Sequence, residues 1–312
     1  MNKLVRSTVV LAALAVACGK DVPQVTFDGA RAIEYARIQV DAGPRIPNSE
    51  AARLVGDRIV QELRKNADTV FEQRWTHVTQ KDSAGKVDSL HMRNIFAQFN
   101  PLAKTRILYV SHWDSRPHAD NSFAVDDKKK PVPGADDGAA STALLLVLAE
   151  ALKAHATTVG VDLLFTDGED YGEFEGEMKD VLIGARYFAE HPLPDASYRP
   201  TFGVLWDMVA NPGVRVMREA YAEQHARDVN DRVWSMAARL GYSSVFSPDI
   251  QDVTDDHRPL LDKGFKVIDV IDLNGYRQYH HTTQDTMDKI SAESLTIMGR
   301  VALALIRAEE KR

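Results

Sequence analysis

Short, continuous apolar runs separated by amphipathic stretches predict a sheet with helices packed on it. The four clearest runs are residues 106–110, 161–165, 202–206 and 266–271. Their apolar positions are consecutive instead of alternating, which is typical of parallel strands buried on both faces. Nearer the N-terminus, residues 70–78 and 94–99 lie on either side of the polar segment 80–86, and this arrangement predicts an antiparallel pair.

Helical periodicity fills the segments between and around these runs. Residues 138–152 are apolar on nearly every face and therefore predict a helix at the centre of the core. In the segment that Ser49 caps, Val55, Ile59 and Leu63 recur four residues apart and form one apolar stripe. Further helices are predicted over residues 28–40 and 228–240, from Tyr187 onward, and from Ser291 to near the end of the chain.

The alternation of strands and helices after the first pair is typical of a doubly wound α/β fold. The predicted fold is therefore a three-layer α/β/α arrangement around a mixed, mostly parallel central sheet. No internal repeat or change of composition divides the sequence, so we expect one α/β domain over residues 28–312.

The composition is ordinary for a globular protein and narrows the choice of partner. Of the 312 residues, 44% are apolar and 27% are charged, and the formal net charge is −7. An acidic chain does not offer the basic surface of a nucleic-acid-binding protein, so we expect no nucleic-acid partner. The run at residues 126–130 is mixed in sign and predicts a solvated loop.

The first residues are typical of a secretory signal. Lys3 and Arg6 precede an apolar stretch over residues 8–17, which is too short for a stable membrane span. The segment ends in small residues before Cys18, the only cysteine, so no intrachain disulfide is expected. We predict that residues 1–17 are a signal peptide and that the protein is exported.

Residues 15–19 also resemble a bacterial lipoprotein cleavage site, although Leu14 lies one position early. On this interpretation Cys18 is the lipidated first residue of the mature chain, and residues 18–27 are a tether. The protein would be periplasmic or lipid-anchored, and the lipid would be its only membrane contact. The alternative is an ordinary signal whose cysteine has no role.

Acidic residues and histidines follow the predicted strands where each apolar run ends. In open α/β sheets, ligands bind at the carboxyl ends of the strands, so we expect these side chains to gather at one edge. Scattered carboxylates and imidazoles in one place are the ligands of a metal ion such as zinc. The residues are His112, Asp114, Asp167, Glu169, Asp170, Asp207 and His281, with Asp136 and Asp137 before the central helix.

One imidazole and two carboxylates, from His281, Asp137 and Asp170, would hold a catalytic zinc with an open coordination position. Such an ion can polarise a carbonyl oxygen. Glu169 adjoins Asp170 and suits general acid/base work on a bound substrate. Asp207 and Asp255 could complete an acidic hydrogen-bonded cluster that raises the pKa of one member.

Each of these residues also has a structural explanation when taken singly. Asp136 and Asp137 could cap the apolar helix, and residues 168–170 could form a plain turn. His112 by itself is more typical of a core histidine. Asp207 is harder to dismiss, because burying a lone carboxylate is costly. Their occurrence together at strand ends favours the metal site.

Several of these motifs are shared with a known family. The chain resembles the zinc-dependent glutaminyl cyclases, which share their fold with the zinc aminopeptidases. The resemblance implies that Asp137, Asp170 and His281 bind one zinc, that Glu169 is the general acid/base, and that Asp207 and Asp255 are its acidic partners. It implies conversion of the N-terminal glutamine of peptides to pyroglutamate with loss of ammonia. The motifs are Asn94-Ile95-Phe96 and residues 111–116, 134–137, 167–170, 255–259 and 281–285.

The main alternative is a zinc aminopeptidase on the same fold with two metal ions, in which His112 and Asp207 would hold the second. A long insertion at residues 171–183, the extra aspartate Asp255 and the segment 100–104 favour the cyclase. Asp170 departs from the animal-type cyclases, which have glutamate there, and Tyr276 and His280 replace other aromatic residues of the pocket. A catalytically silent, lipid-anchored binding protein is disfavoured, because Glu169 and the three ligand positions are all retained.

Overall fold

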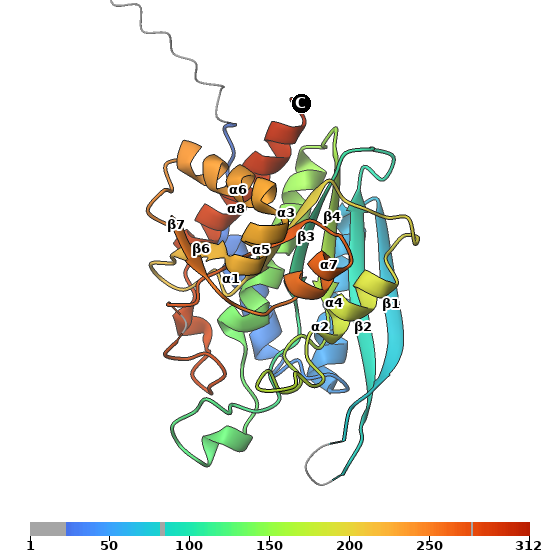
Figure 1. Ribbon diagram of the computed structural model, residues 1–312, viewed down its shortest axis with the longest axis vertical. Coiled ribbons are helices and arrows are strands. Elements are labelled where there is room, and N and C mark those ends of the chain that lie inside the picture. The colour runs from blue at the N-terminus through green and yellow to red at the C-terminus, as the bar shows by residue number, and fades with distance from the viewer. Residues whose placement is uncertain (1–22, 82–84, 276) are drawn as a thin grey trace, which may run out of the picture.

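The computed structural model describes residues 23–81, 85–275 and 277–312, which form three layers with a sheet in the middle (Figure 1). The sheet has six strands in the order β1-β2-β4-β3-β5-β8. β1 and β2 pair antiparallel, and β4, β3, β5 and β8 run parallel to one another. The predicted fold class is confirmed. The strands are β1 (Thr69–Val78), β2 (Ser89–Phe99), β3 (Arg106–His112), β4 (Gly160–Thr166), β5 (Phe202–Asp207) and β8 (Val267–Ile271).

Alternate residues of each inner strand pack into two separate apolar cores. In β3, Ile107 and Tyr109 face the larger core, whereas Leu108 and Val110 face the smaller one. This period of two follows from strand geometry and explains why both faces of the inner strands are mostly apolar. An exception, Asp162 in β4, is buried and paired with Arg106 of β3. The larger core packs against α1 (Gly29–Asp41), α2 (Glu50–Asn66), α3 (Ser141–Ala154), α6 (Arg227–Arg239) and α8 (Ala292–Glu309), and the smaller against α4 (Ile183–Glu190) and α7 (His257–Asp262).

Four short elements of the structure, β6 (Val216–Glu219), α5 (Ala220–His225), β7 (Phe246–Gln251) and α7, have no counterpart in the sequence prediction. A separate parallel pair joins β6 to β7, and α5 follows β6 directly. β6 has four residues and β7 contains Pro248, so neither shows an apolar run. α7 has six residues, too few for a helical period to be visible.

Two predicted helix starts are wrong. α4 begins at Ile183 instead of Tyr187, directly after Leu182, whose φ is 54°. The central helix is regular only from Ser141, because a wider turn over Ala135–Ala140 precedes it and contains non-helical residues. The other predicted helices are present within a few residues of their expected ends.

The predicted signal segment, residues 1–17, and residues 18–22 of the predicted tether lie outside the described residues. Within the described part of the chain, no helix has both the length and the apolar character needed to cross a bilayer.

Candidate metal centre and active site

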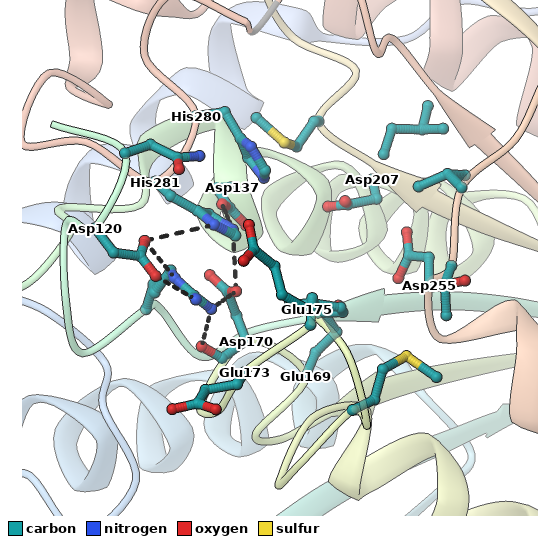
Figure 2. Close-up of a pocket in the computed structure, with 18 residues that line it drawn as sticks. Asp120, Asp137, Glu169, Asp170, Glu173, Glu175, Asp207, Asp255, His280 and His281 are labelled. Carbon is teal, nitrogen blue, oxygen red and sulfur yellow. Dashed lines mark hydrogen bonds and ion pairs between the residues drawn. The ribbon is translucent and has the colours of Figure 1, made fainter. Parts of the chain in front are cut away.

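The candidate residues meet at the carboxyl edge of the parallel strands. His112 is the last residue of β3, Asp207 is the last residue of β5, and residues 167–170 follow β4. Asp137 comes from the turn before α3, and His281 comes from the loop after β8. Asp137, Glu169, Asp170, Asp207 and His281 line one cavity together with Asp255 (Figure 2), and His112 lies beside Asp137 and Asp207. Asp167 does not join them, because its carboxylate accepts the backbone N–H of Arg93 in β2.

The turn before α3 presents Asp137 to the site instead of letting it cap the helix. Gly138 has a φ of 92°, and a Cβ there would lie 2.5 Å from the carbonyl oxygen of Asp114. Asp285 holds the turn, because its carboxylate accepts the backbone N–H groups of Asp136 (2.9 Å) and Asp137 (3.2 Å). No side-chain cap bond forms at this helix start, so the capping interpretation of the aspartate pair is wrong.

The neighbouring aspartate, Asp136, has a structural role. Its carboxylate accepts the backbone N–H of Ala210 at 3.0 Å and the hydroxyl of Tyr279 at 2.7 Å. These bonds join the segments after β5 and β8 to the start of α3.

A second buried carboxylate orients Glu169 and Asp170. Asp114 accepts their backbone N–H groups at 3.1 and 3.2 Å. Arg116 donates from Nη1 to Asp170 Oδ1 at 2.8 Å. The sequence analysis placed Asp114 among the candidate metal-binding residues, whereas its carboxylate binds backbone N–H groups instead. It gave no role to Arg116 or Asp285, although both lie within the shared motifs.

Among the three predicted metal ligands, His281 lies near both carboxylates. His281 Nε2 lies 3.1 Å from Asp170 Oδ1 and 3.8 Å from Asp137 Oδ2. The Oδ2 atoms of Asp137 and Asp170 are buried and have no hydrogen-bond partner. Buried carboxylate oxygens of this kind are costly unless they are protonated or coordinate an ion. One imidazole with two carboxylates therefore fits a divalent cation of the zinc type.

Among the described residues, two sets have ligand atoms that all lie within 4.8 Å of one another, and neither is the predicted set of Asp137, Asp170 and His281. His112 Nε2 lies 3.1 Å from both Asp137 Oδ1 and Asp207 Oδ1, and the three residues can offer ligand atoms within 4.8 Å of one another. The same holds for Asp137, His280 and His281. His112 is therefore part of the site and not an ordinary core histidine, and His280 is a candidate that the sequence analysis assigned only to the pocket.

Two residues of the site have an unusual backbone conformation. His281 has a φ of 54°, and Met208, which follows Asp207, has a φ of 44°. Side chains other than glycine rarely adopt this region, and such strain is concentrated at functional sites.

Burial changes the protonation of the carboxyl groups of the site. Burial raises the pKa of Glu169 well above its usual value, and neighbouring carboxylates raise it further, although His112 opposes the shift. Burial and the charge of Asp207 raise the pKa of Asp255 to about 7. In Asp137, the hydrogen bond and charge of His112 outweigh burial and lower the pKa. The site therefore combines an ionised Asp137 with carboxyl groups that can hold a proton near neutral pH.

These groups share one cavity of about 670 Å³, a volume suited to a small ligand or the end of a peptide. Glu169, Asp170 and Asp255 line its buried part, and Phe174, Glu175 and Met178 from the insertion after β4 line its outer part.

The fold and this site define an enzyme of the zinc-exopeptidase type. The sequence model of Peptidase family M28 matches residues 94–306, and the chain belongs to this family. A glutaminyl cyclase of Bacteroides thetaiotaomicron bound to N-acetylhistamine is 33% identical, with a TM-score of 0.84 over 92% of this chain and 99% of that one. A leucine aminopeptidase precursor from Bacteroides thetaiotaomicron VPI-5482 is 34% identical, with a TM-score of 0.84 over 92% and 98% of the two chains.

The glutaminyl-peptide cyclotransferase of Drosophila melanogaster is 32% identical over 152 residues. These make up 47% of this chain and 39% of that protein, so the match spans well under half of the relative's length. The predicted resemblance to the glutaminyl cyclases is confirmed.

Proposed function

We propose that this protein is a glutaminyl-peptide cyclotransferase that converts N-terminal glutamine of peptides to pyroglutamate and releases ammonia. One structural observation carries the proposal: Glu169 and Asp255, two carboxyl groups with raised pKa values, line the same cavity as the imidazole–carboxylate set. The similarity to glutaminyl cyclases over nine-tenths of the chain supports it.

Asp137, Asp170 and His281 would hold one zinc ion, since His281 Nε2 lies near both carboxylates, each carboxylate has a buried oxygen without a hydrogen-bond partner, and each type of side chain is a common zinc ligand. When bound, zinc would polarise the side-chain amide carbonyl of the glutamine. Arg116 keeps the carboxylate of Asp170 in place through its hydrogen bond to Oδ1, which leaves Oδ2 available.

Glu169 acts as the general acid/base in this proposal. It takes a proton from the attacking α-amine and passes it to the departing ammonia, and its raised pKa makes its carboxylate a stronger base than that of an ordinary glutamate. Asp255 and Asp207, both buried at the same cavity, are its acidic partners. Their raised pKa values keep a proton within this group of carboxyl side chains.

The cavity also favours cyclisation by holding the substrate. The glutamine must fold back so that its amine meets its own amide, and an enclosed site that fixes this conformation removes much of the entropic barrier. No water takes part in the reaction, so a buried general base serves it well.

The test compares two peptides. A glutamine-initiated dipeptide and a leucine-initiated dipeptide are incubated with the zinc-loaded protein, and ammonia and free amino acid are measured. We expect ammonia from the first and no cleavage of the second. We also expect Glu169→Gln to lower kcat at least about 100-fold, as removal of a general base does, while the bound zinc is retained. Release of leucine would contradict the cyclase proposal, and near-normal turnover by Glu169→Gln would contradict the role of this residue.

A zinc aminopeptidase with two metal ions is the second candidate, favoured by the cation set of His112, Asp137 and Asp207. It would release leucine and bind about two zinc ions per chain. Elemental analysis of the purified protein distinguishes the two candidates, because the proposed cyclase requires one zinc ion per chain.

For location, we propose that the protein is exported and lipidated on Cys18, on the strength of the signal-like segment in residues 3–19. A lipidated protein would partition with membranes, and Cys18→Ser would release it into the soluble fraction. Equal partitioning of the two forms would contradict lipidation.

A further inference from the structure

The insertion after β4 forms a small closed hairpin at the mouth of the cavity. The backbones of Glu173 and Lys179 pair antiparallel, and each N–H donates to the other carbonyl at 2.9 Å. A Cβ at Gly172 would lie 1.9 Å from the carbonyl oxygen of Lys179, so the base of the hairpin requires glycine. The tip, residues 174–178, is thereby held in a defined position beside the catalytic groups.

Three side chains of this hairpin tip line the cavity, namely Phe174, Glu175 and Met178, and Glu173 lines it from the base. Figure 2 shows Glu175 pointing from the insertion into the cavity. Glu169 is buried and Met178 is 39% exposed, which places the hairpin around the outer part of the cavity. When the N-terminal residue of a peptide reaches Glu169, the second and third residues of the peptide must therefore lie beside the hairpin.

The outer part of the cavity is strongly acidic. Arg116 is the one arginine or lysine among the described residues that line it, and its guanidinium is already paired with Asp120 and Asp170. Asp255 also faces this cavity with a buried Oδ2 that has no hydrogen-bond partner. Eight carboxyl groups line the cavity, of which Asp137, Glu169, Asp170, Asp207 and Asp255 are buried and Asp120, Glu173 and Glu175 are exposed at the outer part. Arg116 pairs with Asp120, so the outer part keeps the negative charge of Glu173 and Glu175.

We propose that the hairpin at residues 173–179 is a specificity site that selects peptides with lysine or arginine after the N-terminal glutamine. This inference rests on the proposed function. The aliphatic part of the basic side chain would pack on Phe174 and Met178, and its charged end would meet Glu173 and Glu175. An acidic side chain at the same position would be repelled.

The test measures kcat/KM for Gln-Lys, Gln-Arg, Gln-Ala and Gln-Glu peptides of equal length. We expect the basic peptides to exceed Gln-Glu about tenfold, mainly through KM, and the difference to shrink at high salt because the ion pairs are partly exposed. The double substitution Glu173→Gln and Glu175→Gln should reduce the ratio to about twofold. Glu177→Gln is the matched control, because Glu177 is exposed on the same hairpin but does not line the cavity.

Binding of the same peptides to a Glu169→Gln background, measured by calorimetry, tests the hairpin independently of turnover. We expect Gln-Lys to bind more tightly than Gln-Glu, and the added hairpin substitutions to remove this preference. Absence of ammonia from every peptide, with the binding preference intact, would overturn the proposed function and leave the hairpin supported. Equal binding of basic and acidic peptides, or a preference that survives the double substitution, would overturn the specificity site.

Discussion

At the scale of single residues, the site depends on carboxylates that bind backbone instead of substrate. Asp114 holds the N–H groups of Glu169 and Asp170, and Asp285 holds that of Asp137. Both are fully buried. The sequence could predict the ligands, because their types and positions suit a metal ion. It could not predict these supporting residues, because their partners are backbone atoms of segments 55 or more residues away.

The choice between Asp170 and His280 as the third ligand gives the first prediction. Asp170→Asn should lose most of its zinc, because it removes a buried carboxylate whose Oδ2 has no other partner. His280→Asn should keep zinc near one ion per chain and change KM, since His280 lines the cavity. Elemental analysis after dialysis measures the zinc content of both variants and so identifies the third ligand. The reverse pattern would place His280 on the metal with Asp137 and His281.

A second prediction concerns Asp256, which is buried beside the site and accepts a hydrogen bond from Thr166. Burial and the charge of Asp255 raise its pKa to about 8, whereas an aspartate of the unfolded chain ionises near pH 4. Between these values the folded state holds a proton that the unfolded state has lost. The free energy of unfolding therefore falls as pH rises through this window.

Urea unfolding of the zinc-loaded protein at pH 5 and pH 8 measures this effect. We expect Asp256→Asn to reduce the loss of stability between the two pH values by on the order of 2 kcal/mol, since a carboxamide does not ionise. The exposed Asp126→Asn is the control and should leave the loss unchanged. Identical pH dependence in wild type and Asp256→Asn would contradict the prediction.

At the scale of elements, the turn over Ala135–Ala140 shows where tertiary structure overrides local pattern. The sequence predicts a helix from Gly138, yet the φ of 92° at this residue and the pairing of Asp285 with the backbone delay the helix to Ser141. The long inner strands were predictable because burial on both faces makes them apolar. β6, β7 and α7 were not, because elements of four to six residues show no clear period.

Gly138→Ala should damage this turn. Alanine rarely adopts a positive φ such as the 92° of this residue, and the new Cβ would also clash with the carbonyl oxygen of Asp114. We expect a lower melting temperature and loss of zinc, because Asp137 moves with the turn. Gly264→Ala is the control: its φ is 82°, but nothing lies within 4 Å of a new Cβ. It should lose stability and retain zinc, and equal zinc loss in both variants would contradict the role of the turn.

At the scale of the whole molecule, the site joins parts of the chain that are far apart in sequence. Asp137, Asp170 and His281 come from three different connections between strands and helices. One bound ion would therefore link these connections across the edge of the sheet and stabilise the folded state, because the unfolded chain does not hold the ligands together.

The place where the N-terminal segment joins the folded domain bears on how a membrane-anchored form of the enzyme would meet its substrates. In Figure 1 the N-terminal segment, coloured blue, joins the body at one end, whereas the strand ends that carry the site face the other. If Cys18 is lipidated, as we propose, the tether would attach to the domain at the end away from the cavity. Peptides could then reach the cavity from the side opposite the attachment.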